Sequence, residues 1–364
     1  MATAENSPKA TTRRTFIQVG SAALTALGFS QLGFRPAHRL DNTPINRPET
    51  VGTSFSQVQC RHLKMTDAET RETYLKILDM GFDLVRIGAY MDEIDERGFD
   101  FLNWQIEEAE KRGVKLMLNV GIKVQRFPEF HPPINMRDRL KFWEKSHQTI
   151  GEDDQTFEEV VSNTRNVIQK YKDKEIIKYW QIENEPFDRL SFANNHIVAQ
   201  RLHDKQVEVL KQEIPSAKRA RSGAVGLPDS EENFRDMVKD KPDVGGFNVY
   251  YSVPTPFGGY YTLSDSDFDK LALKARVLKE NGITPIIFES QAEPWENGSP
   301  VHTEDREYPS SNPDIAIRLA SKLGSIGYDT VMLWGAEYWI YRANRGNTSW
   351  IDKLSEFVKP KKAA

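Results

Sequence analysis

The chain has 364 residues, of which 38% are hydrophobic and 28% are charged, and its 49 basic and 53 acidic residues leave a formal net charge of −4. The charges are well mixed and form no basic stripe, so we expect no nucleic-acid partner. The single cysteine, Cys60, excludes an intramolecular disulfide, and the fold must therefore rest on its hydrophobic core.

Residues 1–40 are predicted to be an export signal and linker rather than part of the fold. Arg13 and Arg14 precede an uncharged, mildly apolar run that ends at Phe34. A cationic head before a short apolar stretch is typical of a signal peptide, and this run is too short and too rich in Gly and Ser to span a membrane. The alternative is a disordered tail with a chance arginine pair.

The segment 13–17 resembles the twin-arginine translocation motif, with Gln18 where a lysine is frequent. We therefore expect the twin-arginine translocase as a partner during export, and a periplasmic or secreted location. No lipid-acceptor cysteine follows the segment, so we expect no stable membrane anchor.

From residue 51 onward, short apolar runs alternate with longer amphipathic stretches. This alternation indicates a parallel sheet with helices packed outside it. The run at 217–224 is the least typical strand, because Lys218, Arg219 and Arg221 must point outward or line a polar end of the sheet. Strands are predicted at 51–57, 83–88, 114–120, 176–182, 217–224, 244–250, 283–289 and 329–335. Helices are predicted at 66–81, 99–113, 155–172, 194–213, 229–239, 265–280, 312–325 and 350–359.

The junctions from helix to strand repeat one plan. In "DMGFDLVRI", "KRGVKLMLN", "ENGITPIIF" and "SIGYDTVML", a helix end is followed by a glycine, one or two residues and a strand. This repetition predicts a single-domain (β/α)₈ TIM barrel over residues 50–360. A doubly wound open sheet would also alternate, but no glycine-rich dinucleotide motif follows the first strand.

The connections that follow the strands are much longer than those that precede them. Long insertions are expected at 121–150, 251–263, 290–311 and 336–348. In a barrel, this asymmetry marks the carboxyl-terminal face as the working face. The side chains near strand ends on that face are the candidate site: Arg86, Asn119, Asn184, Glu185, Asn248, Tyr250, Tyr251, Glu289, Trp334 and Glu337. Trp295, in the loop after the seventh strand, is a further candidate for substrate binding.

Two of these candidates, Glu185 and Glu289, are carboxylates at separate strand ends. Glycoside hydrolysis needs one carboxyl as a proton donor and another as a nucleophile or base. Neighbouring amides suit sugar hydroxyls, and aromatic faces suit sugar rings. The pattern therefore predicts a glycosidase acting on an oligo- or polysaccharide.

The segments "IENEP" (182–186) and "IIFES" (286–290) resemble the clan A glycoside hydrolases, which include the family five cellulases and mannanases. The resemblance covers residues 50–360. It implies that Glu185 is the general acid/base, that Asn184 contacts the sugar 2-hydroxyl, and that Glu289 is the nucleophile of a retaining double displacement.

The same resemblance implies roles for residues around the two carboxylates. Arg86, and either Tyr250 or Tyr251, would steady the nucleophile, and Trp334 would form the floor beneath the sugar. The sequence does not distinguish two roles for Glu337, contact with the substrate and support of a loop. No cofactor or metal is expected, because the seven histidines are scattered without a metal-binding spacing.

Several features depart from the common families of the clan. "SQAEPWENG" follows Glu289, so Glu293 or Glu296 could compete for the nucleophile role, although Glu289 ends the apolar run. "RFPEFHPP" (126–133) is not a clan signature, so this resembles an uncommon branch whose substrate cannot be carried over.

Within "IENEP", the side chain of Glu183 should point to the opposite side of the strand from that of Asn184, so Glu183 is expected to be structural. Pro186 is expected to hold Glu185 in an extended backbone.

Two alternatives to a retaining β-glycosidase remain at this point. One is a non-catalytic carbohydrate-binding protein on a degenerate barrel. The other is a transglycosylase or a lyase on the same barrel. A monomer is expected in each case.

Overall fold

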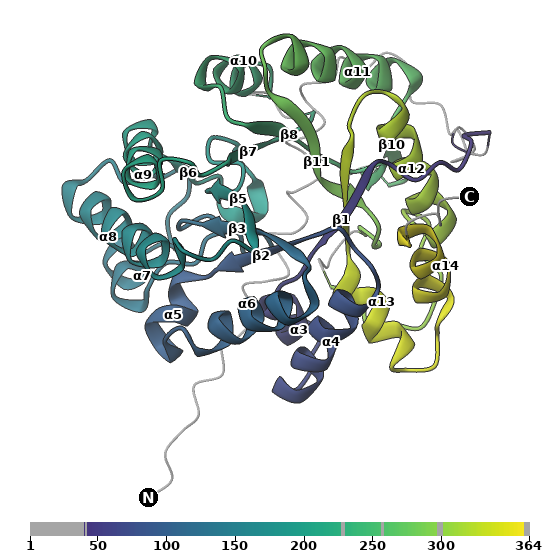
Figure 1. Ribbon diagram of the computed structural model, residues 1–364, viewed down its shortest axis with the longest axis horizontal. Coiled ribbons are helices and arrows are strands. Elements are labelled where there is room, and N and C mark those ends of the chain that lie inside the picture. Colours follow the sequence, from purple (N-terminus) through teal and green to yellow (C-terminus); the bar gives the residue numbers. More distant parts are fainter. Residues whose placement is uncertain (1–39, 41, 227–229, 256–257, 297–300, 360–364) are drawn as a thin grey trace, which may run out of the picture.

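The computed structural model describes residues 40, 42–226, 230–255, 258–296 and 301–359 (Figure 1). The predicted export signal lies outside the described residues, apart from Leu40. Within the described ranges, no helix is long and apolar enough to cross a membrane.

Eight parallel strands close into a barrel, as the sequence predicts (Figure 1). Neighbouring strands are consecutive in the chain, and the last strand pairs with the first through Thr50 and Thr330. The (β/α)₈ fold is therefore confirmed. The strands are β1 (Thr50–Ser54), β2 (Leu84–Ala89), β3 (Lys115–Val120), β5 (Ile177–Ile182), β7 (Arg219–Ala224), β8 (Val244–Val249), β11 (Thr284–Gln291) and β12 (Thr330–Trp334).

A ring of helices surrounds the barrel (Figure 1). Several of these helices begin at a capping residue. Thr66 and Glu69 form a capping box at the start of one helix. Asn312, which precedes Pro313 at the start of another, accepts a hydrogen bond from the main-chain N–H of Ile315. The helices are α4 (Asp67–Asp79), α6 (Asp100–Arg112), α8 (Asp154–Tyr171), α9 (Gln200–Glu213), α10 (Ser230–Asp240), α11 (Asp265–Glu280), α12 (Pro313–Ser325) and α14 (Ser349–Val358).

The connections that follow the strands contain short elements of their own. They are α3 (Gln57–His62), α5 (Met91–Arg97), α7 (Ile134–Leu140), a 3₁₀ turn (Ser191–Ala193), α13 (Ala336–Ala343), and two small sheets that pair β4 (Thr149–Ile150) with β6 (Ile197–Val198) and β9 (Ser252–Pro254) with β10 (Tyr260–Thr262).

Two sequence expectations are wrong here. Helix α9 begins at Gln200 rather than 194, because Ile197 and Val198 pair with β4 instead. Much of the expected loop 336–348 is the buried helix α13.

The barrel interior and the layer beneath the helices form two separate apolar clusters. The interior is filled by Leu84, Met117, Tyr179, Ala220, Val244, Ile286, Phe288 and Met332. On β7, Arg219 and Arg221 point away from this interior and both pair with Asp240 at the end of α10. This outward ion pairing is why a strand with two arginines fits in the barrel.

Candidate active site

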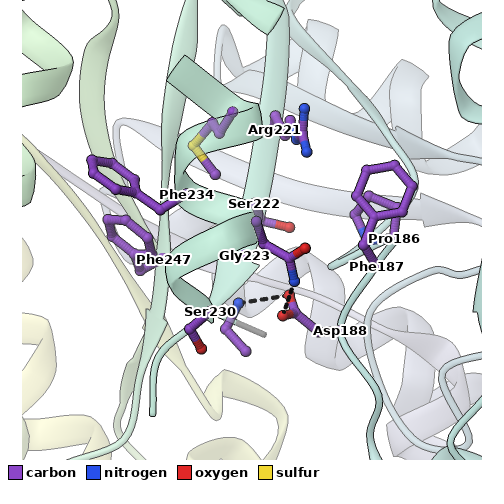
Figure 2. A pocket seen from close by; sticks show the side chains of 12 residues that line it. Pro186, Phe187, Asp188, Arg221, Ser222, Gly223, Ser230, Phe234 and Phe247 are labelled. Atoms are coloured by element: carbon purple, nitrogen blue, oxygen red, sulfur yellow. Dashed lines mark hydrogen bonds between the residues drawn. The ribbon is translucent and has the colours of Figure 1, made fainter. Parts of the chain in front are cut away.

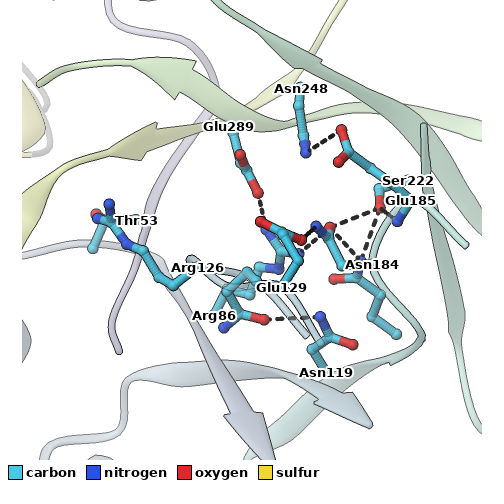
Figure 3. A network of polar contacts seen from close by, with 12 residues as sticks. Thr53, Arg86, Asn119, Arg126, Glu129, Asn184, Glu185, Ser222, Asn248 and Glu289 are labelled. Atoms are coloured by element: carbon cyan, nitrogen blue, oxygen red, sulfur yellow. Dashed lines mark hydrogen bonds and ion pairs between the residues drawn. The ribbon is translucent and has the colours of Figure 1, made fainter. Parts of the chain in front are cut away.

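The carboxyl-terminal ends of four strands bring the predicted site residues together (Figure 3). Arg86 comes from β2, Asn248 from β8 and Glu289 from β11, while Asn184 and Glu185 directly follow β5. All five side chains are buried at the barrel mouth. Parallel strands end at the same rim, which explains how residues far apart in the sequence meet here.

Glu289 has hydrogen-bond donors on both carboxylate oxygens. Arg86 Nη1 lies 2.9 Å from Oε1, and the Tyr250 hydroxyl donates to Oε2 at 2.8 Å. The pairing register of β11 shifts on both sides between Ile287 and Ser290, and such a bulge redirects the side chain toward the mouth. The two donors hold both oxygens in a fixed orientation, which suits a nucleophile.

Glu185 has a different environment. Its Oε1 accepts a hydrogen bond from Asn248 Nδ2 at 2.8 Å, and its Oε2 has no hydrogen-bond partner among the described residues. Burial raises the pKa of Glu185 well above its ordinary value, and the nearby carboxylates of Asp188, Glu289 and Glu129 raise it further. A protonated carboxyl with one free oxygen suits a proton donor.

The segment after β5 does not continue as an extended strand. The backbone angle φ is +57° at Glu183 and +46° at Glu185, so both residues are left-handed. The expectation that Pro186 holds Glu185 extended is therefore wrong. The hydroxyl oxygen of Ser222 on β7 accepts the main-chain N–H of Glu185 at 3.1 Å, and this bond stabilises the turn. Such strained backbone is common where a site must aim a side chain.

Asn184 connects the two halves of the site. Its Oδ1 accepts from Arg86 Nη2 at 2.6 Å and from the Ser222 hydroxyl at 3.1 Å. Its Nδ2 donates to Oε2 of Glu129 at 2.8 Å. Glu129 is a third carboxylate in the site, and the sequence analysis missed it. The available signal was its place in "RFPEFHPP", the segment that departs from the clan pattern.

Glu183 is a brace rather than a reactive group. Its carboxylate accepts hydrogen bonds from the main-chain N–H groups of Ile122 and Lys123, at 3.1 and 2.6 Å, and from Gln206 Nε2 at 2.6 Å. It also lies so close to Gly121 that a Cβ there would be 2.2 Å from Glu183 Cδ. These contacts tie the turn after β5 to the loop after β3.

A second carboxylate cluster lies at the barrel mouth. Arg126 pairs with Glu293 and, through Nη2 at 2.7 Å, with Oε2 of Glu337. The main-chain N–H of Ser56 donates to Oε1 of Glu337 at 2.6 Å. Glu293 therefore has a different cation from Glu289. Its contact with Arg126, rather than with Arg86 and Tyr250, favours Glu289 as the nucleophile.

The remaining aromatic candidates lie in different settings. Trp334 is 3% exposed, and the Arg126 guanidinium carbon lies 3.7 Å from the centroid of its ring, so a cation packs on the ring that was expected to lie beneath the sugar. Tyr251 is fully buried in the outer core, and it is Tyr250 that reaches Glu289. Trp295 is partly exposed, with its ring centroid 4.9 Å from that of Tyr250.

Two further residues do not touch the central carboxylates. Asn119 Nδ2, on β3, donates to Oε1 of Gln125 in the following loop at 2.8 Å. Glu296 accepts hydrogen bonds from Tyr260 and from Ser310 in the outer loops.

A small pocket lies next to the site, between β7 and α10 (Figure 2). Asp188 lies at its edge and accepts hydrogen bonds from the main-chain N–H of Ala224 at 2.9 Å and from Asn233 Nδ2 at 2.6 Å. Its lining includes neither Glu185 nor Glu289. The pocket is therefore separate from the two carboxylates at the barrel mouth.

In the part of the chain that the structure describes, no three His, Cys, Asp or Glu side chains are grouped so that they could hold a metal ion.

Comparison with known proteins supports the fold. No family model and no curated protein sequence matches the chain. Solved structures with a similar fold include a β-galactosidase from Bacillus circulans sp. alkalophilus (12% identity, TM-score 0.58, covering 87% of this chain and 56% of that one). A GH10 endoxylanase retrieved from a sugarcane soil metagenome matches at 13% identity and a TM-score of 0.52, covering 86% of this chain and 97% of that one.

Xylanase 10B from Thermotoga maritima matches at 14% identity and a TM-score of 0.51, covering 78% of this chain and 82% of that one. The chain spans about half the length of the β-galactosidases, 52% of the one from Halorubrum lacusprofundi and 56% of the one named above. At these identities, the likeness shows a shared TIM-barrel fold.

Proposed function

We propose that the protein is a retaining glycoside hydrolase that cleaves β-O-glycosidic bonds of an oligo- or polysaccharide. The observation that carries the proposal is the contrast between two buried carboxyls at one barrel mouth. Glu289 has a donor on each oxygen, whereas Glu185 has one free oxygen and a raised pKa. Double displacement needs one carboxylate positioned as a nucleophile and a second carboxyl that can donate a proton.

In the proposed first step, Glu289 attacks the anomeric carbon and forms a glycosyl-enzyme. Glu185 gives its proton to the leaving glycosidic oxygen, so the leaving group departs as a neutral alcohol. The bond to the sugar removes the negative charge of Glu289, and the pKa of Glu185 then falls. As a carboxylate, Glu185 takes a proton from water, which attacks the anomeric carbon and releases Glu289.

Several other observations support this proposal. The fold is shared with proteins described as β-galactosidases and xylanases, which act on sugars. The partly exposed rings of Tyr250 and Trp295 lie beside Glu289 and offer apolar faces to a sugar.

The roles of the two carboxyls are separable with Glu185→Ala and Glu289→Ala. On an aryl β-glycoside whose leaving group needs no proton, Glu185→Ala should still form the glycosyl-enzyme, and added azide should trap it as the β-glycosyl azide. Glu289→Ala should lose turnover of every substrate by about 10³-fold or more, and azide should give the α-glycosyl azide. Glu110→Ala, on the exposed face of α6, is the matched control.

The products distinguish the alternatives. Wild-type protein should release a β-configured sugar first, as read by NMR of the anomeric proton. Full activity in both alanine variants would overturn the assignment. Sugar binding without turnover would indicate a non-catalytic barrel, an unsaturated product a lyase, and transfer products of retained configuration a transglycosylase.

We also propose that residues 1–40 direct export of a monomer through the twin-arginine translocase to the periplasm or beyond. The adjacent Arg13 and Arg14 before an uncharged apolar run support this. Replacing both with lysine should keep the protein in the cytoplasm, as followed by cell fractionation. Export of the double-lysine variant at the wild-type level would overturn the proposal.

A further inference from the structure

The loop after β3 folds back as a hairpin that places two side chains in the mouth. The main-chain N–H of Val124 donates to the carbonyl of Glu129 at 2.8 Å, and the N–H of Glu129 donates to the carbonyl of Arg126 at 2.7 Å. Arg126 and Glu129 have φ angles of +85° and +73°. Glycine would adopt such angles without strain, so keeping two long side chains there points to a use for them.

The two side chains enter different clusters. Arg126 lies between Glu293 and Glu337, and each of those carboxylates thereby has a cation. Glu129 enters the central site and accepts a hydrogen bond from Asn184 (Figure 3). The hairpin therefore adds a positive charge to one cluster and a negative charge to the other.

Glu129 is the least satisfied carboxylate of the mouth after Glu185. It is 6% exposed, its Oε2 has one neutral donor, and its Oε1 has no hydrogen-bond partner among the described residues. It forms no ion pair in that part of the chain, whereas Glu289 pairs with Arg86. A nearly buried carboxylate without a counterion is costly, and a bound cation removes that cost.

The position of Glu129 relates it to the reacting end of the sugar. Asn184 holds Glu129 with its nitrogen and Arg86 with its oxygen, and Arg86 in turn holds Oε1 of Glu289. Glu129 is thus connected through Asn184 and Arg86 to one oxygen of Glu289, whereas Tyr250 donates to the other oxygen. A substituent close to the anomeric carbon would meet it.

We propose that Glu129 is a specificity-determining residue whose free carboxylate oxygen binds an ammonium group on the sugar ring above Glu289. The preferred substrates are then β-glycosides of amino sugars that carry an unmodified amine. The ammonium supplies both the hydrogen-bond donor and the counterion that Glu129 lacks. This inference rests on the proposed function for the reaction, but its test measures binding alone.

The test compares the binding of glucosamine, glucose and N-acetylglucosamine, and of the corresponding galacto sugars, by NMR titration at pH 7. In the wild-type protein we expect the amine of each set to bind about tenfold more tightly than the hydroxyl or acetamide sugar, because a hydrogen bond to a charged partner is worth that much. Glu129→Gln keeps an oxygen for Asn184 but removes the charge. It should abolish the preference and leave binding of the hydroxyl sugars within about threefold.

A pH series separates charge recognition from a structural role. Burial and the negative charge of Glu289 raise the pKa of Glu129 to about 7. As the pH falls from 7 to 5, Glu129 takes up a proton, so binding of the amine should weaken while binding of the hydroxyl sugar stays constant. Glu110→Gln removes a negative charge on the surface of α6 and should change neither affinity.

Equal binding of amine and hydroxyl sugars by the wild-type protein overturns the proposal, and this comparison needs no variant. An equal loss for all sugars in Glu129→Gln also overturns it, since that is the result of positioning Asn184. The two proposals fail separately. If the protein hydrolyses glycosides but shows no preference for the amine, the proposed function stands and the role of Glu129 is wrong. If it prefers the amine but hydrolyses no glycoside, the role of Glu129 stands and the proposed function is wrong.

Discussion

Arg86 on β2 and Glu289 on β11 form a buried ion pair of 2.9 Å, although 203 positions separate them in the sequence. The other terminal nitrogen of the same guanidinium lies 2.6 Å from Asn184 Oδ1, just after β5. One side chain thus aligns groups from three strands around the position of the reacting carbon. Only the planar fork of an arginine can hold both partners at once.

Arg86→Lys tests this alignment. Lysine keeps the positive charge but can serve only one of Glu289 and Asn184, so kcat/KM should fall about 10- to 100-fold. The control is Arg112→Lys, in an ion pair on the surface of α6. Unchanged kcat/KM in Arg86→Lys would show that this ion pair is not part of the reacting centre.

Tyr250→Phe removes the hydroxyl that donates to Glu289 Oε2 and keeps the ring that packs on Trp295. A hydrogen bond to a charged group contributes roughly 1.5–3 kcal/mol, so kcat should fall about 10- to 100-fold.

The matched control is Tyr328→Phe. Tyr328 is also buried, and its hydroxyl donates to the Leu271 carbonyl at 3.0 Å in the outer layer. Both variants should lose about 1 kcal/mol of unfolding free energy, but only Tyr250→Phe should lose activity. Equal kcat in the two variants would contradict the role of Tyr250.

The basic limb of the pH–rate profile should report Glu185, which is active in its protonated form. Burial raises the pKa of Glu185. Among the nearby carboxylates, Asp188 has the largest further effect in the same direction. Asp188→Asn removes that negative charge. The pKa of Glu185 should then fall, and the basic limb should move to lower pH.

Asp314→Asn, in an exposed ion pair at the start of α12, controls for a general effect of charge. The measurement is kcat/KM between pH 4 and 9. A basic limb that stays in place, or moves to higher pH, in Asp188→Asn would contradict the assignment of that limb to Glu185.

The unfolding free energy should be largest between about pH 4.5 and 6.5. Burial raises the pKa of Glu183 and Glu293 to about 7. The protons bound to these carboxyls in the folded state therefore stabilise the protein fully below pH 4.5, and this contribution is lost as the pH rises through 7. Burial lowers the pKa of His62 and His302 to about 4, so their contribution is present above 6.5 and is lost as pH falls through 4.

Chemical unfolding at pH 4 to 8 measures this curve. Glu293→Gln removes one of the raised carboxyls and keeps an oxygen for Arg126, so stability should decline less steeply above pH 6. Glu304→Gln, in an exposed pair with Arg306, should leave the slope unchanged. A wild-type stability that rises steadily from pH 6 to 8 would be the opposite of the expected result.

The strand ends were predictable because their signals are local. Glu289 ends an apolar run and Arg86 lies within one, so their place at the rim follows from strand length and barrel topology. The choice between Tyr250 and Tyr251 was not predictable, since it depends on which side chain points into the mouth after β8 ends. Trp334 was placed at the correct strand end, but the sequence has no sign of the arginine that covers its ring.

The left-handed turn in "WQIENEP" shows the limit of local reasoning. The preference of a residue before proline for extended backbone is real, but it is outweighed here by the Ser222 contact and by the buried bonds of Glu183 to Ile122 and Lys123. Those partners come from other βα units, so no window of sequence around Glu185 contains them.

The sequence by itself determined the eight-stranded barrel and the placement of Glu185 and Glu289 at strand ends, because alternating apolar patterns, glycine stops and strand-end residues are properties of short segments. Only the tertiary structure decided the surroundings of that pair. Arg126 and Glu129 come from an aperiodic hairpin, and they reach the mouth because main-chain N–H groups at the beginning of that loop donate buried hydrogen bonds to Glu183. Which cation meets which carboxylate follows from barrel closure, which no local pattern encodes.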